Sequence, residues 1–278
     1  MDGDSGARGT VEIALTNVHR RFGSKQVLRG VTLTIHAGDT LAIVGTSGCG
    51  KTVLLEHILG KLAPDSGTIA VVDHSDPAAP LRDLGQVGAF DIEHIHRHWG
   101  VVFQRNALFS SSVYDNVALW LKDVRGLDDA AIAPLARHAL AQVGLPNDDE
   151  FLATDHHELS GGMAKRLAIA RALAMEPRVL FYDEPTTGLD PVTAGRMHDL
   201  IFATHNAVVA GNRRRTTIIV THDKDLLTRL RPRTVMLHDG VVYFDGPFAA
   251  FEQSQSAIIR PYFDLMPILH HLPPAARR

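Results

Sequence analysis

The chain has 278 residues, and its 28 Lys and Arg nearly balance 31 Asp and Glu, giving a formal net charge of −3. This balance argues against a basic surface that binds nucleic acid. The content of hydrophobic residues, 45%, is too high for a disordered chain. A single cysteine excludes an internal disulfide framework or a multi-cysteine zinc site. No apolar run approaches the roughly 18–20 residues of a membrane span, and the acidic N-terminus lacks a signal-peptide core, so we expect a soluble, cytoplasmic chain.

The first predicted elements are strands, after a Gly- and Asp-rich segment at residues 1–10 that we expect to be irregular. Apolar and polar residues alternate around 13–15 and 31–35, which is the period of half-buried strands. The apolar run Leu41–Val44 suits a strand buried on both faces of a parallel sheet. It leads into a glycine-rich loop at 45–50 and a helix over Thr52–Leu59, whereas residues 73–98 lack periodicity and are expected to be mostly loop.

Helical patterns dominate the middle of the chain, from about residue 107 to 175. One helix is expected to begin at Asp128 or Asp129 and end near Val143, and another to run from Met163 to Met175. Buried strands follow at 179–182 and 217–220 with a helix at about 193–209 between them, and Asp239-Gly240 indicates a β-hairpin. The order predicts an α/β nucleotide-binding core with an inserted helical subdomain.

A phosphate-binding loop is predicted at residues 45–52, which fit the pattern G-x-x-x-x-G-K-[ST]. Glycines let the backbone approach phosphate oxygens with its N–H groups pointing inward, and the following helix adds its positive N-terminal end. Lys51 is expected to reach the β- and γ-phosphates, and the Thr52 hydroxyl to ligate Mg²⁺. The nucleotide-binding residues of this loop are Gly45, Thr46, Ser47, Gly48, Cys49, Gly50, Lys51 and Thr52.

Two acidic residues, Asp183 and Glu184, follow the predicted strand at 179–182. Carboxyl ends of parallel strands face the ligand crevice. Asp183 is therefore expected to hold Mg²⁺ and Glu184 to take a proton from the attacking water. Alone, the pair would equally suit a solvated acidic turn; with the phosphate loop it predicts a nucleotide hydrolase.

Further segments make the sequence resemble the ATP-binding-cassette (ABC) ATPases. Residues 159–163, Leu-Ser-Gly-Gly-Met, resemble the signature of that family, and residues 185–191 resemble its D-loop. His222 and Gln104 lie where the family has its switch histidine and its Q-loop glutamine. All these motifs stand in the order typical of the family.

The resemblance implies a P-loop ABC ATPase fold: a parallel-sheet core, an N-terminal antiparallel β-subdomain and an inserted α-helical subdomain. It implies an ABC ATPase domain over 11–252, with the helical subdomain at about 105–175. The tail, 253–278, either caps the core of its own chain or reaches a second copy or a small partner subunit.

The resemblance also implies roles for single residues. Two copies would sandwich two ATP molecules, with Ser160, Gly161 and Gly162 of one copy facing the ATP held by the other. Asp190 would communicate across this homodimer. The implied catalytic residues are Glu184, His222 and Gln104; the implied Mg²⁺ ligands are Thr52, Gln104 and Asp183; the implied adenine contacts are Phe22 and Val27.

Residues 103–110, 113–118 and 159–166 are similar to the ATPases of bacterial Mce/Mla-type phospholipid transporters. This implies an ATP-hydrolysing subunit on the cytoplasmic side of the inner membrane, bound to permease subunits, a small regulatory subunit and a periplasmic lipid-binding Mce-type protein. For the tail, 253–278, this resemblance to lipid transporters favours the contact between subunits. The alternatives are the ATPase of an amino-acid-type importer and a soluble ABC ATPase outside transport. A GTPase is disfavoured because the sequence has no Asn-Lys-x-Asp motif.

Two local features carry further expectations. Cys49 lies in the phosphate loop, where a helix terminus and Lys51 favour thiolate, so alkylation is expected to inhibit and ATP to protect. An apolar cluster near Gln104 either packs within the helical subdomain or forms a groove for a permease helix. Its members are Leu108, Phe109, Val113, Tyr114 and Val117.

Overall fold

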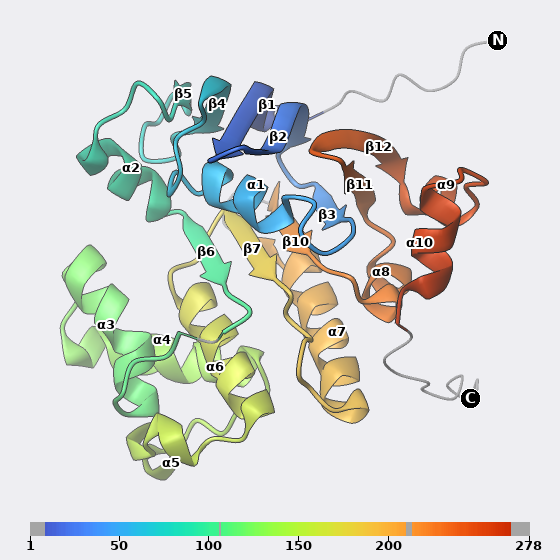
Figure 1. The fold of residues 1–278 in the computed structure, drawn as a ribbon. Helices are drawn as coiled ribbons and strands as arrows, with labels where there is room; N and C mark the ends of the chain where they lie inside the picture. The colour runs from blue at the N-terminus through green and yellow to red at the C-terminus, as the bar shows by residue number, and fades with distance from the viewer. Residues whose placement is uncertain (1–8, 106, 210–212, 268–278) are drawn as a thin grey trace.

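The computed structural model describes residues 9–105, 107–209 and 213–267, so the expected irregularity of the N-terminus lies almost entirely outside the described residues. Two sheets form the body of the molecule (Figure 1). The larger has the strand order β12-β11-β3-β10-β7-β6, in which β12 is antiparallel and the other pairings are parallel. Its strands are β3 (Thr40–Val44), β6 (Trp99–Val102), β7 (Val179–Asp183), β10 (Thr216–Val220), β11 (Arg233–His238) and β12 (Val241–Pro247).

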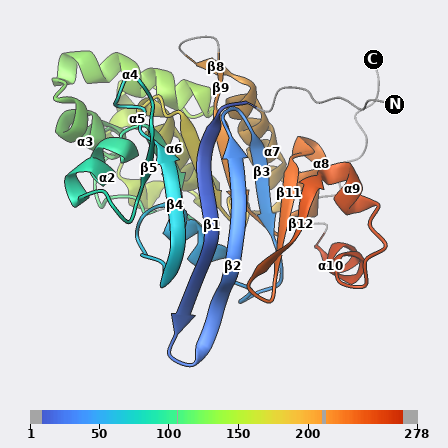
Figure 2. The same cartoon turned by 90° about the horizontal axis from the view of Figure 1, so that it is seen from above.

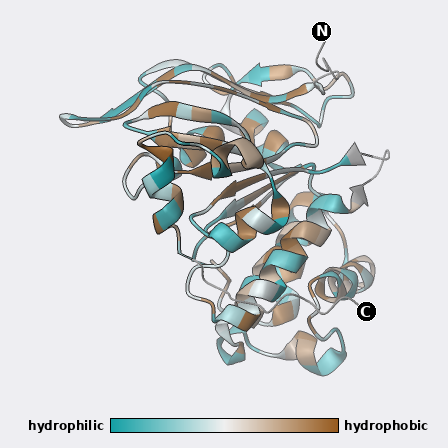
Figure 3. Cartoon of the chain, turned by 90° about the vertical axis from the view of Figure 1, so that its right-hand side faces the viewer, coloured by the Kyte–Doolittle hydropathy of each residue, from teal (hydrophilic) through white to brown (hydrophobic). Residues whose placement is uncertain are grey.

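The smaller sheet is antiparallel and covers one side of the molecule, as Figure 2 shows from above. Its order is β2-β1-β4-β5, with β1 (Val11–Phe22), β2 (Lys25–His36), β4 (Ser66–Val72) and β5 (Leu81–Asp83). Helix α1 (Lys51–Ile58) packs between the two sheets, where Leu54 and Ile58 join one core with residues of both. In Figure 3 the central strands are mostly brown, whereas the outer helices alternate between teal and brown. This core fixes α1, and hence the loop before it.

Four helices form the inserted helical subdomain: α3 (Val113–Arg125), α4 (Asp129–Gln142), α5 (Asp149–Ala153) and α6 (Gly161–Ala174). Side-chain oxygens of Ser112, Asp128, Asp148 and Ser160 cap their N-termini. The predicted start of α4 is thereby confirmed, and Gly144, with φ 66°, follows its end. Val113 and Val117 are fully buried among these helices, so the packing interpretation holds for these two members of the apolar cluster.

The prediction that residues 73–98 are mostly loop is wrong for their second half. Helix α2 (Ala89–His96) lies there, after β5. Among the apolar side chains of α2 whose burial is described, only Ile95 is fully buried, and Phe90 is 67% exposed. A short helix with one buried residue carries too little periodicity to be recognised from sequence.

The remaining helices are α7 (Pro191–Asn206), α8 (Lys224–Leu230), α9 (Phe248–Glu252) and α10 (Ile259–Leu265). Strand β8 (Val208–Val209) pairs antiparallel with β9 (Arg213–Arg214). Helix α7 starts two residues before the predicted position because Asp190 caps it and Pro191 suits its first turn. The hairpin prediction at Asp239-Gly240 is confirmed, since both residues have positive φ and join β11 to β12.

The C-terminal segment packs on the core of its own chain as far as the structure describes it. Ile259, Phe263 and Met266 are buried against Phe248 and Phe251 on the face of the larger sheet that carries α8. Leu265, in contrast, is 83% exposed. The cap alternative therefore describes residues 259–266, and residues 268–278 lie outside the described part.

Within the described residues, each helix is too short or too polar to cross a membrane.

Tyr182, a fully buried residue of β7, makes a polar contact with Thr204 inside the core. Its hydroxyl lies 3.2 Å from Thr204 Oγ1, and burial raises its pKa to about 12. Replacing Tyr182 by Phe should lower the free energy of unfolding by about 0.5–1.5 kcal/mol, the usual net value of one hydrogen bond. Urea unfolding of Tyr182→Phe, Thr204→Val and the double variant measures this. Strictly additive effects would show that the two hydroxyls do not interact.

Candidate active site

Four strand ends meet at one edge of the larger sheet. Strand β10 pairs in parallel with both β3 and β7, and β6 pairs in parallel with β7, so their carboxyl ends lie side by side. The phosphate loop follows β3 and Gln104 follows β6. Asp183 is the last residue of β7 with Glu184 next to it, and His222 follows β10. Ligands of open α/β sheets bind outside this edge.

The phosphate loop wraps from β3 into α1. Gly45 has φ 145°, and a Cβ there would lie 2.4 Å from the carbonyl oxygen of Leu237, so only glycine fits. Lys51 Nζ donates to the carbonyl oxygens of Gly45, at 2.7 Å, and of Thr46, at 3.2 Å. The ammonium is thus held across the mouth of the loop, where it can meet an anion bound by the loop amides and the start of α1.

Glu184 and His222 form an ion pair at the strand ends. Glu184 Oε2 lies 2.8 Å from His222 Nδ1, and the hydrogen bond and charge of Glu184 raise the pKa of His222. The backbone of Glu184 has φ 48°, and its N–H donates to the Val220 carbonyl at 2.8 Å. Its carboxylate is therefore held against His222 at the sheet edge.

Asp183 and Lys165 are partly buried charges beside this pair. Burial and the neighbouring Glu184 raise the pKa of Asp183, so its anion would gain from a nearby cation. Lys165, on α6, donates to the Glu184 carbonyl oxygen at 3.3 Å, and burial lowers its pKa. Its place next to the signature segment was the only sequence signal for a role at this site.

A hydrogen-bonded network lies behind His222. Asp223 Oδ2 accepts from Thr186 Oγ1 at 2.7 Å and lies 2.8 Å from His198 Nε2. Burial opposes the charged carboxylate of Asp223, but the hydrogen bonds from His198 and Thr186 hold its pKa below the ordinary value. Its other oxygen caps α8, so the network fixes the turn that carries His222.

A cavity of about 660 Å³ unites most of the predicted residues. Its lining includes Val27, Gly45, Thr46, Ser47, Gly48, Gly50, Lys51, Thr52, Gln104, Asp183, Glu184 and His222. Lys25 and Tyr262, which sequence reasoning did not assign, also line it.

Other predicted residues lie away from this cavity lining. Ser160 caps α6 through a bond from Met163 N to its Oγ at 3.3 Å, and Asp190 caps α7. A Cβ on Gly162 would lie 2.5 Å from Thr193 Cγ2, so the start of α6 packs tightly on α7. The ring of Phe22 is 45% exposed, with the Arg20 guanidinium 4.8 Å from its centroid.

The expectation of a thiolate at Cys49 is wrong. Burial raises the pKa of this thiol, and this outweighs the opposing charge of Lys51 and the backbone N–H groups. Cys49 is half-buried, and a Cβ on Gly45 would lie 2.7 Å from its Sγ, so the thiol packs closely against the start of the loop.

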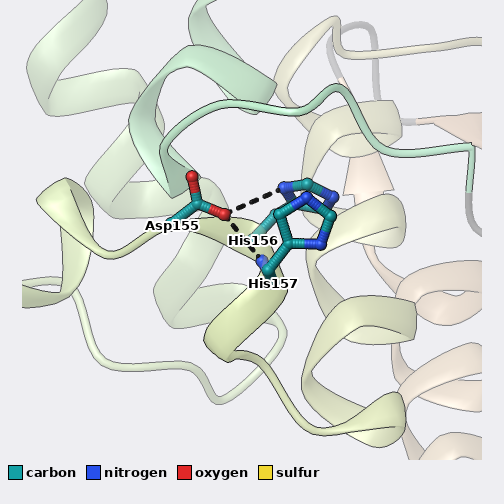
Figure 4. Close-up of side chains that lie close together, drawn as sticks. All are labelled: Asp155, His156 and His157. Atoms are coloured by element: carbon teal, nitrogen blue, oxygen red, sulfur yellow. Dashed lines mark hydrogen bonds and ion pairs between the residues drawn. The ribbon is translucent and has the colours of Figure 1, made fainter.

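One His- and Asp-containing cluster outside the cavity precedes the signature segment. Asp155, His156 and His157 have ligand atoms within 4.8 Å of one another (Figure 4). Asp155 Oδ1 accepts from the backbone N–H of His157 at 2.9 Å and lies 3.2 Å from His156 Nδ1. These contacts cap the turn η1 (His156–Glu158), so local structure explains the cluster and we assign it no metal.

A family profile described as ABC transporter matches residues 28–187. The chain belongs to the ABC transporter family. It is 34% identical over 265 residues to the protein TRIGALACTOSYLDIACYLGLYCEROL 3 of Arabidopsis thaliana, covering 91% of this chain and 73% of that protein. It is also 34% identical over 255 residues to the histidine transport ATP-binding protein HisP of Pseudomonas aeruginosa, covering 90% and 96%.

Solved structures show the same ABC cassette fold. A dimeric ATP-binding cassette bound to ADP and phosphate superposes with a TM-score of 0.70 at 26% identity, over 85% of this chain and 98% of that one. The predicted fold class is confirmed, and the chain is an ATP-hydrolysing ABC ATPase.

Replacing Glu184 by Gln should lower ATP turnover by about 10²–10⁴-fold while ATP binding is retained, because a general base contributes on that scale. Steady-state hydrolysis and equilibrium nucleotide binding measure the two effects. Glu150→Gln, at an exposed position on α5, is the matched control. Near-normal turnover of Glu184→Gln would remove Glu184 from the reaction.

The same variant should lower the pKa of His222, because Glu184 is the main group that raises it. NMR titration of the His222 ring protons measures this. Since folding raises this pKa, the ion pair stabilises the fold below the unfolded value of about 6.5. That contribution is lost as the pH rises through the raised pKa. An unchanged titration midpoint in Glu184→Gln would contradict the assigned cause.

Cys49 should alkylate more slowly at neutral pH than a cysteine in an unfolded peptide, because burial raises its pKa. The rate of iodoacetamide reaction should rise only at higher pH, while modification should inhibit the ATPase and ATP should protect. Mass spectrometry across a pH series checks this. Cys49→Ser gives the background, since Cys49 is the single cysteine. A midpoint below that of the peptide would contradict the burial argument.

Proposed function

We propose that this chain is the ATP-hydrolysing subunit of a membrane lipid transporter and works as a homodimer bound to permease subunits. The observation that supports the ATPase chemistry most directly is the shared cavity. The phosphate loop, Lys51 and the ion pair of Glu184 with His222 all line it. An anion-binding loop and a carboxylate base then act on one bound phosphate chain.

In the proposed reaction the loop amides and Lys51 hold the phosphates of ATP, and Val27 and Phe22 contact the adenine. Glu184 accepts the proton of the attacking water through its carboxylate. His222, already bonded to Oε2 of Glu184, orients that carboxylate. The raised pKa of His222 means that a proton is retained between the two side chains over a wider pH range.

The residues also fit Mg²⁺, which we propose as the cofactor of ATP. Thr52, Gln104 and Asp183 line the cavity and offer oxygen ligands, the kind that Mg²⁺ prefers. The raised pKa of Asp183 reports a carboxylate whose charge is poorly compensated by its neighbours. When bound, the ion would neutralise phosphate charge.

The homodimer is supported by the predicted signature and D-loop residues, which do not line the cavity of their own chain. Ser160, Gly161, Gly162 and Asp190 begin α6 and α7 and do not line the cavity of their own chain, as far as the described residues show. A second copy would bring the N-terminus of α6 to the bound nucleotide, where a helix start favours an anion. The solved cassette named above is described as dimeric.

Permease docking is supported by apolar surface near Gln104. Leu119 and Trp120 on α3 are 37% and 47% exposed, and Phe109 is 39% exposed. Trp120 and Phe103 line a cavity of about 310 Å³ between the helical subdomain and β6. We propose that a helix of a permease on the cytoplasmic side of the bacterial inner membrane contacts this surface.

Lipid as the transported substrate is supported by two likenesses. One relative carries the name of a lipid, trigalactosyldiacylglycerol. The segments at 103–110, 113–118 and 159–166 also resemble Mce/Mla-type ATPases, whose partners would include a small regulatory subunit and a periplasmic Mce-type protein. Similarity to the histidine transport protein HisP favours an amino-acid importer as the second candidate.

The deciding experiment is isolation of the intact membrane complex through a tag on this chain. Mass spectrometry should find a permease and co-purifying phospholipid, and phospholipid vesicles should support ATP-driven transfer by the reconstituted complex. A complex carrying Lys51→Ala should assemble but lack ATP-driven transfer. Stimulation by histidine or another amino acid, with no phospholipid transfer, would overturn the lipid assignment in favour of the importer.

A further inference from the structure

Helix α10 reaches the nucleotide cavity from the C-terminal end of the chain. Tyr262, in the middle of α10, accepts a hydrogen bond at its hydroxyl oxygen from the backbone N–H of Gly45, at 3.0 Å. The two residues are separated by 217 positions in sequence. Tyr262 also lines the same cavity as Lys51 and His222. A residue of the C-terminal segment thus bonds directly to the first residue of the phosphate loop.

The position of α10 is set by burial rather than by the loop itself. Ile259 and Phe263 are 3% and 4% exposed, and they pack with Phe248 and Phe251 of α9. The Lys224 ammonium lies 4.0 Å from the Phe263 ring centroid and donates to the Phe263 carbonyl at 3.3 Å. A helix anchored in this way can hold the Tyr262 hydroxyl at a fixed place.

The loop is tightly confined where Tyr262 meets it. A Cβ on Gly45 would lie 2.4 Å from the Leu237 carbonyl oxygen and 2.7 Å from Cys49 Sγ. Tyr262 supplies the acceptor for the Gly45 N–H in this crowded place. Burial raises the pKa of Tyr262 to about 12. The hydroxyl therefore stays neutral and, while accepting from Gly45, keeps a proton to donate.

We propose that Tyr262 is a positioning residue for nucleotide binding, through which α10 holds the phosphate loop in its binding conformation. The inference rests on the proposed role of residues 45–52 in holding ATP. Without the tether, the free loop samples more conformations, and binding must then order it at a cost in affinity. Chemistry after binding is left unchanged, because Tyr262 orients the loop and not Glu184.

The coupling runs in both directions, since linkage between two sites is reciprocal. ATP in the loop should stabilise the docked state of α10, and displacement of α10 should weaken ATP binding. A cavity of about 500 Å³ lies between the two, lined by Thr46, Ser47 and His222 on one side and Ile258, Tyr262 and Met266 on the other. The docking of α10 should therefore differ between the ATP-bound and the ATP-free protein.

The test compares Tyr262→Phe with Tyr243→Phe in the full chain. Tyr243 is 42% exposed and its hydroxyl contacts Ser256 Oγ at 2.8 Å, so its variant removes a hydroxyl in the same region without touching the loop. Tyr262→Phe should raise the Kd for MgATP about 3–10-fold, the effect of one lost hydrogen bond. Turnover at saturating ATP should change less than about twofold. Tyr243→Phe should leave the Kd unchanged.

Hydrogen exchange gives the reciprocal readout. In the parent chain, ATP should slow amide exchange in 259–265, and in Tyr262→Phe this protection should be smaller. An unchanged Kd in Tyr262→Phe, or an equal rise in Tyr243→Phe, would overturn the tether. The variant Lys51→Ala distinguishes a failure of the tether from a failure of the proposed function. If Lys51→Ala does not weaken ATP binding, the assignment of the phosphate loop itself is wrong.

Discussion

The parallel pairing of β10 with both β3 and β7 is the constraint on which the site depends. Each of these strands carries one part of the site at its carboxyl end. These parts lie together only when neighbouring strands pair in the correct register. Val220 pairs with Ile43 on one side and Asp183 on the other. One slipped residue would turn every side chain of β10 to the opposite face of the sheet. The apolar residues that fill both faces prevent this, so hydrophobic burial is what sets the geometry of the polar edge.

Desolvation at that edge is costly, and the neighbouring charges offset it only in part. Loss of solvation on burial is the main cause that raises the pKa of Asp183 and lowers the pKa of Lys165. These opposing charges lie close together with Glu184, and Lys165 bonds to its carbonyl. Fixed charges in a partly dry cavity act more strongly on a bound phosphate chain than the same charges in water. The energy spent on burial is thus recovered as preorganisation for an anionic ligand.

The sequence predicted the parts of the site that are local in the chain. The phosphate loop, the start of α4 and the hairpin at Asp239-Gly240 each depend on a few adjacent residues with defined backbone needs. Helix α2 was missed because one buried side chain leaves no period. The thiol state of Cys49 was misjudged because nearby positive charge is visible in a sequence, whereas burial is not.

Contacts between distant segments were beyond sequence reasoning. Nothing in residues 253–267 indicates that one tyrosine meets an amide at the end of β3, because that meeting depends on where α9 and α10 pack against the larger sheet. Helix α10 carries both the buried residues Ile259 and Phe263 and the residue that contacts the loop, Tyr262. Any force that unpacks Phe263 must also move Tyr262. If Tyr262 tethers the phosphate loop as proposed, a partner that displaces α10 would also act on the nucleotide site.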